Sequence, residues 1–360
     1  MVSCFAQDYA EARAGFLSSA RARGLVVESA MHPSRKGARG EELAMDAALF
    51  GAAAAPSLLI VTSGTHGVEG FCGSGCQRAL LADDDLLRRA DAGRVAILLV
   101  HAVNPHGFSW LRRANEDNID LNRNFLDFAQ PRVRNTGYEE LHDLLLPDAW
   151  PPTAPNGAAL QAIRARIGER GFQAALTRGQ DSRPGGLFFS GTAPSWSNRT
   201  LRGFVRRHGA GRRHIGWIDI HTGLGPSGHG EKIFAGRDDA ADLARTRAWY
   251  GADVMSYYDG KSASAEVKGP AALCIHEECP DAQVANMGLE FGTQPMDQVV
   301  HALRGAHWLE LHSDAPAALR AEIDRAIRDA FYTDTDAWKG MILGQSRTAV
   351  LQAVTALSAA

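Results

Sequence analysis

Hydrophobic and polar positions follow two patterns along this chain. Short apolar runs that end at a glycine or a polar residue are typical of buried strands. They fall at residues 57–64, 94–100, 215–220 and 286–293, with a shorter run at 25–29. Apolar residues at helical spacing predict helices at residues 8–22, 41–50, 70–81, 158–177, 302–311, 316–331 and 337–358. Strands that alternate with helices predict an α/β fold, with a mixed, mostly parallel central sheet flanked by helices.

One long stretch interrupts this alternation. Between residues 126 and 214 the chain holds a proline-rich segment, one predicted helix and a glycine-rich segment. We interpret this stretch as a large insertion within a single domain that spans residues 1–360. An insertion can simply pack on the surface, but its position within the chain favours a role as part of a pocket wall.

Three polar side chains follow two of the predicted strands. His66 and Glu69 come directly after the strand at 57–64, and His221 ends the strand at 215–220. Because open α/β sheets place their ligands at the carboxyl ends of strands, we expect the three side chains to converge. Two imidazoles and one carboxylate leave a zinc ion with an open coordination position. The sequence therefore predicts one zinc ion per chain, and the insertion lies between its ligands.

Composition and charge narrow the class of protein. The 360 residues are 45% hydrophobic and 22% charged, which is typical of a globular enzyme. The formal net charge of -3, without a basic run, argues against a nucleic acid partner. We expect no membrane partner and a cytoplasmic location, because apolar runs are short and acidic residues come too early for a signal peptide. Five cysteines are too few to suggest a disulfide framework.

Several motifs together resemble a known enzyme superfamily. They are His66-Gly-Val-Glu69, Asn104-Pro-His-Gly107, an arginine at 112 or 113, Asp120-Leu-Asn-Arg-Asn-Phe125, His221 and the strand-borne Glu290. This set resembles the zinc carboxypeptidase superfamily, which includes the aspartoacylase and succinylglutamate desuccinylase deacylases, and looks like a bacterial branch of it. The resemblance implies a zinc carboxypeptidase-like fold.

Catalytic roles follow from chemistry and from this resemblance. Glu290 is the one charged residue in an apolar strand, and amide hydrolysis needs a carboxylate base near the metal. Arg112 and Arg113 compete for the place opposite the metal, where negative charge develops on the carbonyl oxygen, and the resemblance favours Arg113. Arg112 is then a candidate for substrate binding or a surface residue.

The Asp-Leu-Asn-Arg motif is interpreted in the same way. By resemblance, Asn122 and Arg123 hold the terminal carboxylate of the substrate, for which their side chains are suited. Asp120 is expected to accept a hydrogen bond from His66 and so fix its tautomer, with Asp219 as an alternative for such a role. His101, His106, His229 and Glu231 are nearby in sequence, but the ligand count does not require them.

The leading hypothesis is a zinc hydrolase that cleaves an amide bond next to a free carboxylate, as a carboxypeptidase does. Its substrate would be a peptide or a small molecule. The alternative is an N-acyl amino acid deacylase, and a third hypothesis is a non-catalytic carboxylate-binding protein. Carboxypeptidases place a mobile tyrosine before the catalytic glutamate, and here Tyr257 and Tyr258 lack a clear motif. The oligomeric state stays open.

Overall fold

The computed structural model describes residues 2–132 and 134–360. The strands are β1 Val27–Lys36, β2 Glu42–Phe50, β3 Ser57–Ser63, β4 Val95–His101, β5 His214–Thr222, β6 Gly230–Phe234, β7 Met255–Ser256 and β8 Gln283–Phe291. The α-helices are α1 Tyr9–Ala22, α2 Gly70–Leu81, α3 Asp84–Ala92, α4 Pro105–Ser109, α5 Thr136–Leu145, α6 Ala154–Thr177, α7 Trp196–Gly209, α8 Ala240–Tyr250, α9 Ile275–Glu278, α10 Met296–Leu311, α11 Ala317–Phe331 and α12 Asp336–Ala359. Short 3₁₀ helices are η1 Val2–Cys4, η2 Gly67–Glu69, η3 Leu121–Arg123 and η4 Ala271–Cys274.

All of these strands belong to one mixed sheet. Its order is β1-β2-β4-β3-β5-β8-β6-β7. The central neighbours β4, β3, β5 and β8 run parallel. The pairs β1–β2, β2–β4 and β8–β6 are antiparallel, and β7 runs parallel to β6. The predicted α/β fold with a mixed, mostly parallel sheet is therefore confirmed.

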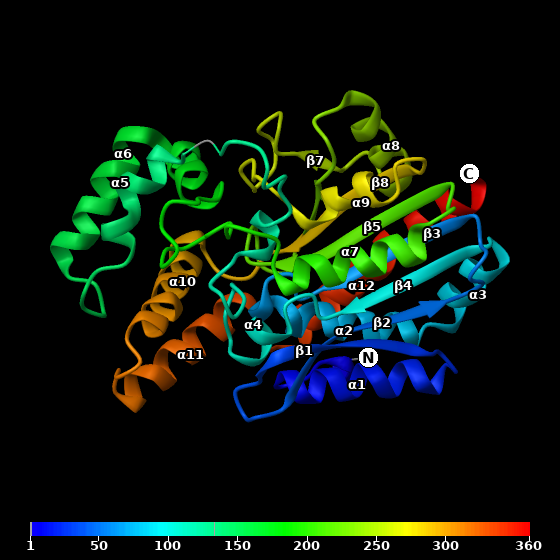
Figure 1. The fold of residues 1–360 in the computed structure, drawn as a ribbon, viewed down its shortest axis with the longest axis horizontal. Helices are drawn as coiled ribbons and strands as arrows, with labels where there is room; N and C mark the ends of the chain where they lie inside the picture. Colours follow the sequence, from blue (N-terminus) through cyan, green and yellow to red (C-terminus); the bar gives the residue numbers. More distant parts are fainter. Residues whose placement is uncertain (1, 133) are drawn as a thin grey trace.

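Both faces of the central strands are buried. In β3, Leu59 and Val61 join the apolar cluster that includes α1, α2 and α12, whereas Leu58 and Ile60 join the cluster that includes α7. Figure 1 shows α7 on one side of the sheet and α2 and α12 on the other. Two covered faces explain why these strands read as continuous apolar runs, because neither face needs polar side chains.

A second group of helices gathers at one end of the sheet. Figure 1 shows α5, α6, α10 and α11 extending beyond the sheet at this end. They form their own apolar cluster, in which Leu176, Val299 and Phe331 pack with Val68 of η2. Because η2 follows β3 directly, these helices cover the region where the central strands end.

The predicted helix at 41–50 is wrong. Residues 42–50 form strand β2, which pairs with β1 on one side and with β4 on the other. Leu43 and Ala48 reach one apolar cluster and Met45 and Ala47 the other, so the segment is buried on both faces. An apolar segment this short fits either period, and the two neighbouring strands decide the outcome because they bond its backbone on both sides.

Other elements differ less from the prediction. The predicted strand at 25–29 is longer, since β1 continues to Lys36 at the sheet edge. Elements that the sequence did not indicate include α3, α5, α7, α8, β6 and β7. Within 126–214, helix α7 packs against α9 and β2 rather than over the end of the sheet. Among the helices that the structure describes, none is long and apolar enough to cross a membrane.

Candidate metal centre and active site

Three buried side chains converge at the end of the central strands. His66 immediately precedes η2 and Glu69 is the last residue of η2, just beyond β3, and His221 lies on the neighbouring strand β5. One potential ligand atom from each lies within 4.8 Å of the other two. Gly67 permits this arrangement, because a Cβ there would lie 2.0 Å from the carbonyl carbon of Gly107. The structure thus brings together the three residues that the strand ends predicted.

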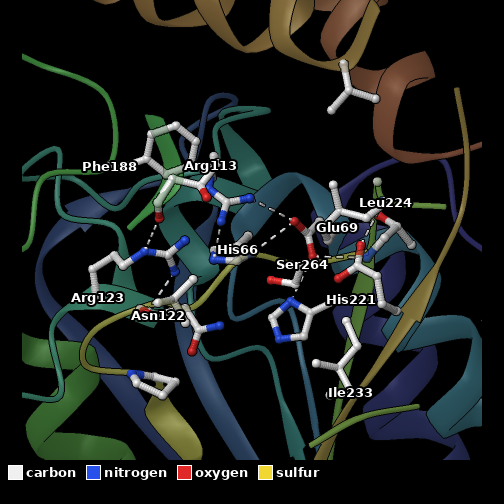
Figure 2. A pocket seen from close by; sticks show the side chains of 18 of the residues that line it. His66, Glu69, Arg113, Asn122, Arg123, Phe188, His221, Leu224, Ile233 and Ser264 are labelled. Atoms are coloured by element: carbon white, nitrogen blue, oxygen red, sulfur yellow. Dashed lines mark hydrogen bonds and ion pairs between the residues drawn. The ribbon is translucent and has the colours of Figure 1, made fainter. Parts of the chain in front are cut away.

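The two histidines are held in matching orientations. The Nδ1 atom of His66 lies 2.9 Å from Oε1 of Glu69, and the Nδ1 atom of His221 lies 3.0 Å from Oε2 of the same carboxylate. Each Nε2 atom faces a different carboxylate, at 3.1 Å from Asp120 Oδ1 and at 2.8 Å from Asp219 Oδ2. Figure 2 shows His66, Glu69 and His221 side by side in the pocket.

This donor set can hold a metal ion. When each Nε2–H donates to its aspartate, the Nδ1 lone pairs of both histidines are left free beside Glu69, as metal ligation requires. The prediction from the sequence gave Asp219 only as an alternative to Asp120 for bonding a ligand histidine. In the structure each aspartate lies beside its own histidine, Asp120 beside His66 and Asp219 beside His221. The hydroxyls of Thr62 and Thr65 donate to Asp219 at 2.6 and 2.8 Å and fix its position.

The charges around the cluster favour a cation. Burial alone would raise the pKa of Glu69, but the charges and hydrogen bonds of His66 and His221 outweigh it and hold the pKa below its usual value. Burial likewise opposes the positive charge of His221, yet Asp219 and Glu69 keep its pKa well above the usual value. A buried site that stabilises a protonated histidine in this way attracts positive charge, and a divalent ion would replace that proton.

Arg113 lies directly beside the cluster. Its Nε donates to Asp120 Oδ2 at 2.9 Å, and its Nη1 donates to Glu69 Oε1 at 3.3 Å. Its Nη2 is 2.8 Å from Nε2 of His66. In the histidine tautomer whose Nε2 carries no hydrogen, this atom accepts a hydrogen bond from Arg113 and does not donate one to Asp120. The guanidinium carbon also sits over the ring of Phe188, at 5.1 Å from its centroid. Arg113 is therefore a fixed cation on the wall of the site.

Glu290 reaches the same cavity from β8. It pairs in register with His221 on β5, and its Oε1 accepts a hydrogen bond from the backbone N–H of Leu224 at 3.0 Å. Gly223 makes the turn that presents this N–H, with a φ of 133°. Burial, together with repulsion from Glu69, raises the pKa of Glu290 to about 7. A carboxyl group whose pKa is near neutrality can both accept and return a proton.

The raised pKa predicts how the stability of the metal-free protein depends on pH. Because the folded state holds its Glu290 proton up to about pH 7 and the unfolded state releases it near 4.5, stability should fall as pH rises between these values. The loss due to this group should be about 3 kcal/mol. Urea unfolding of metal-free wild type and Glu290→Gln at pH 5 and pH 8 would measure it. Equal pH dependence in both proteins would contradict the prediction.

Asn122 and Arg123 also line the cavity. The Arg123 side chain is buried, and it donates from Nε to the carbonyl of Thr177 at 2.7 Å and from Nη1 to the carbonyl of Asn122 at 2.9 Å. Burial lowers the pKa of Arg123 to about 10, although Asp120 opposes the change. Figure 2 shows Arg123 and Arg113 on the same side of the pocket as Phe188. The Oδ1 atom of Asn122 accepts a hydrogen bond from the backbone N–H of Ala271 at 2.8 Å.

Other candidates lie elsewhere. Arg112 lines a neighbouring, smaller pocket, where its Nη1 is 3.1 Å from Glu310 Oε2, so the structure does not bring it together with the cluster. His101 is buried against Phe16, and His229 is exposed. The Glu231 carboxylate accepts a hydrogen bond from the backbone N–H of Ala263. His106 stacks on Trp110. None of these side chains lines the cavity of the described residues that contains His66.

The cavity around the cluster has a volume of about 120 Å³. Segment 126–214 contributes the lining residues Gln173, Leu176, Thr177 and Phe188. Tyr257 also lines it, and its buried hydroxyl has no hydrogen-bond partner among the described residues. The sequence contains no motif that marks Phe188 as a site residue, because only the path of the insertion brings it to the cavity.

Comparison with known families identifies the chain. Residues 5–345 match the model of a family described as "Protein of unknown function (DUF2817)". The chain belongs to this family. A comparison with curated proteins gives no match for this DUF2817 chain.

The DUF2817 chain is also similar to solved structures. One is carboxypeptidase A from Helicoverpa armigera, at 11% identity and a TM-score of 0.42, covering 89% of this chain and 73% of that one. Bovine thrombin-activatable fibrinolysis inhibitor has 11% identity and a TM-score of 0.47, over 98% and 97% of the two chains. A succinylglutamate desuccinylase/aspartoacylase family protein from Shewanella amazonensis has 18% identity and a TM-score of 0.37, over 79% and 72%.

Proposed function

We propose that this protein is a zinc-dependent hydrolase that cleaves an amide bond next to a free carboxylate, in the manner of a carboxypeptidase. One observation carries the proposal: His66, Glu69 and His221 form a buried cluster in a cavity that Arg113, Arg123 and Glu290 also line. A zinc ion held by this cluster would act as a Lewis acid and lower the pKa of a water molecule.

Side chains of the site carry out the remaining tasks of the reaction, which are proton transfer, charge stabilisation and orientation of the histidines. Glu290 takes a proton from the attacking water and returns it to the departing nitrogen, a role that its pKa suits. Arg113 stabilises the negative charge that develops on the carbonyl oxygen, because it is already fixed at the cavity wall. Asp120 and Asp219 hold the two histidines in the ligating tautomer.

Asn122 and Arg123 select the substrate in this proposal by pairing with its carboxylate. Burial strengthens the pairing, since little water competes for the guanidinium. The lining residues of segment 126–214 support its role as part of the pocket wall of a single domain. A small cavity with such a wall suits a compact substrate as well as a peptide end, so N-acyl amino acid deacylation is the second candidate.

A parallel screen tests the proposed function. The zinc-loaded protein would be incubated with short peptides that carry a free C-terminus and with N-acyl amino acids, and release of the amine would be measured. Cleavage of either set supports the proposal and decides between the two candidates. Binding of these compounds without any cleavage would contradict it and would favour a carboxylate-binding protein.

Replacing Arg123 should change substrate preference. A charge-assisted pair contributes about 1.5–3 kcal/mol, so Arg123→Met should reduce the preference for a free acid over its amide by roughly ten- to a hundredfold. The measurement is kcat/KM on a matched acid and amide pair. Arg212→Met is a suitable control, because Arg212 is also buried and bound to backbone carbonyls but lies outside the cavity. Equal slowing of both substrates by Arg123→Met would show that Arg123 is only structural.

A further inference from the structure

A second cavity adjoins the candidate active site. Its volume is about 350 Å³, compared with about 120 Å³ for the cavity that contains the metal cluster. The two cavities share the lining residues Gln173, Leu176, Thr177, Met296 and Val300. Because the same side chains border both spaces, the second cavity lies next to the one that contains the cluster.

Its walls come from two helices that are distant in sequence. One wall is α6, from the segment at 126–214, and the other is the first part of α10, which lies beside it in Figure 1. Arg164 of α6 donates to Asp297 of α10 at 2.5 Å, which links the two walls. Gln173 Nε2 donates to the carbonyl of Ala263 at 2.7 Å and links α6 to the loop before η4. The cavity is thus bordered by segments that contact one another directly.

The surface inside this cavity is mainly apolar. Leu160, Phe172, Leu176, Met296 and Val300 line it. Three arginines also line it, of which Arg170 is exposed to solvent, whereas Arg164 and Arg304 have partners within the protein. Arg164 pairs with Glu169 as well as Asp297, and Arg304 donates to the carbonyls of Leu144 and Leu145. An apolar group therefore suits the cavity, because it would bury apolar surface against these side chains.

We propose that the second cavity is a subsite for an elongated apolar group on the carbonyl side of the scissile amide. This inference rests on the proposed function, in which the amine half of the substrate ends at its carboxylate on Arg123. The half that can continue past the cluster is then the acyl half. A fatty acyl chain and a run of apolar peptide residues share this chemistry, and both would bury apolar surface between α6 and α10.

The test compares acyl chains of increasing length on one amino acid. Zinc-loaded wild type would be given N-acetyl-, N-hexanoyl- and N-decanoyl-phenylalanine, together with acetyl-Leu-Leu-Phe as the peptide arm. The readout is kcat/KM for cleaved compounds and Kd by calorimetry for uncleaved ones. Burial of each methylene should raise kcat/KM, or lower Kd, about two- to fourfold. N-decanoyl-phenylalanine should therefore be better than N-acetyl-phenylalanine in the measured constant by at least about a hundredfold. An advantage for the peptide over decanoyl would identify a peptide as the source of the apolar group.

Variants locate the effect in the second cavity. Val300→Trp narrows the boundary between the cavities and should remove most of the gain with chain length, and Met296→Trp gives a second test at the same boundary. Val26→Trp is the matched control, because Val26 is 84% exposed and should leave the gain unchanged. Equal values for acetyl and decanoyl in wild type would overturn the inference. Absence of cleavage with a gain in Kd would instead contradict only the proposed function.

Discussion

The Glu290→Gln variant is expected to keep its metal and its substrate affinity while kcat falls by at least about a hundredfold. Glutamine has nearly the same shape and can still accept the hydrogen bond from the N–H of Leu224, so the local structure should persist. It cannot take up a proton from water, so only the proton-transfer step is removed. The measurements are zinc content, Kd and kcat with a substrate from the screen.

A matched control is available for this substitution. Glu278 is also largely buried, at 7% side-chain exposure, but it pairs with Arg202 and Arg206 away from the cavity. Glu278→Gln should therefore keep kcat within a few-fold of wild type. Near-normal turnover by Glu290→Gln would show that another group is the base, and Glu231, which is paired with Glu290 across β6 and β8, would be tested next.

Loss of either histidine should abolish stoichiometric metal binding and, with it, activity. His66→Ala and His221→Ala each leave two of three ligands, and Glu69 then lies beside Asp120 or Asp219 with less positive charge to offset it. Metal analysis after gel filtration should find one zinc per wild-type chain and almost none in the variants. Activity should fall by at least about a thousandfold, because the metal supplies the Lewis acid.

His101→Ala is the control for removing a buried imidazole. His101 is fully buried on β4, but it bonds to Ser74 and stacks on Phe16 rather than joining the cluster. This variant should retain its zinc even if it is less stable. Full zinc occupancy in both His66→Ala and His221→Ala would refute the ligand assignment, whereas loss of zinc with normal activity would refute the metal-dependent mechanism.

Much of the fold was predictable because burial leaves a strong local signal. The central strands carry apolar side chains on both faces, so β3, β4, β5 and β8 could be recognised from their runs alone. The segment at 41–50 had the same kind of signal but fits either period, and its state depends on the backbones of β1 and β4. Short or peripheral elements such as β7 and α8 have little pattern, since few of their side chains are buried.

The sequence by itself determined the candidate ligands, because parallel strands bring their carboxyl ends to one edge wherever they lie in the chain. The proposed base stood out as the one charge in an apolar strand, and the role of the arginine motif is what the family resemblance implies. Only the tertiary structure decided between Arg112 and Arg113 as neighbour of the cluster, since a one-residue step along the chain turns one side chain toward Glu69 and the other toward Glu310. It also paired Asp219 with His221 and brought Phe188 and α6 to the cavity. Such contacts join residues far apart in sequence, and no local pattern encodes where a long insertion folds back.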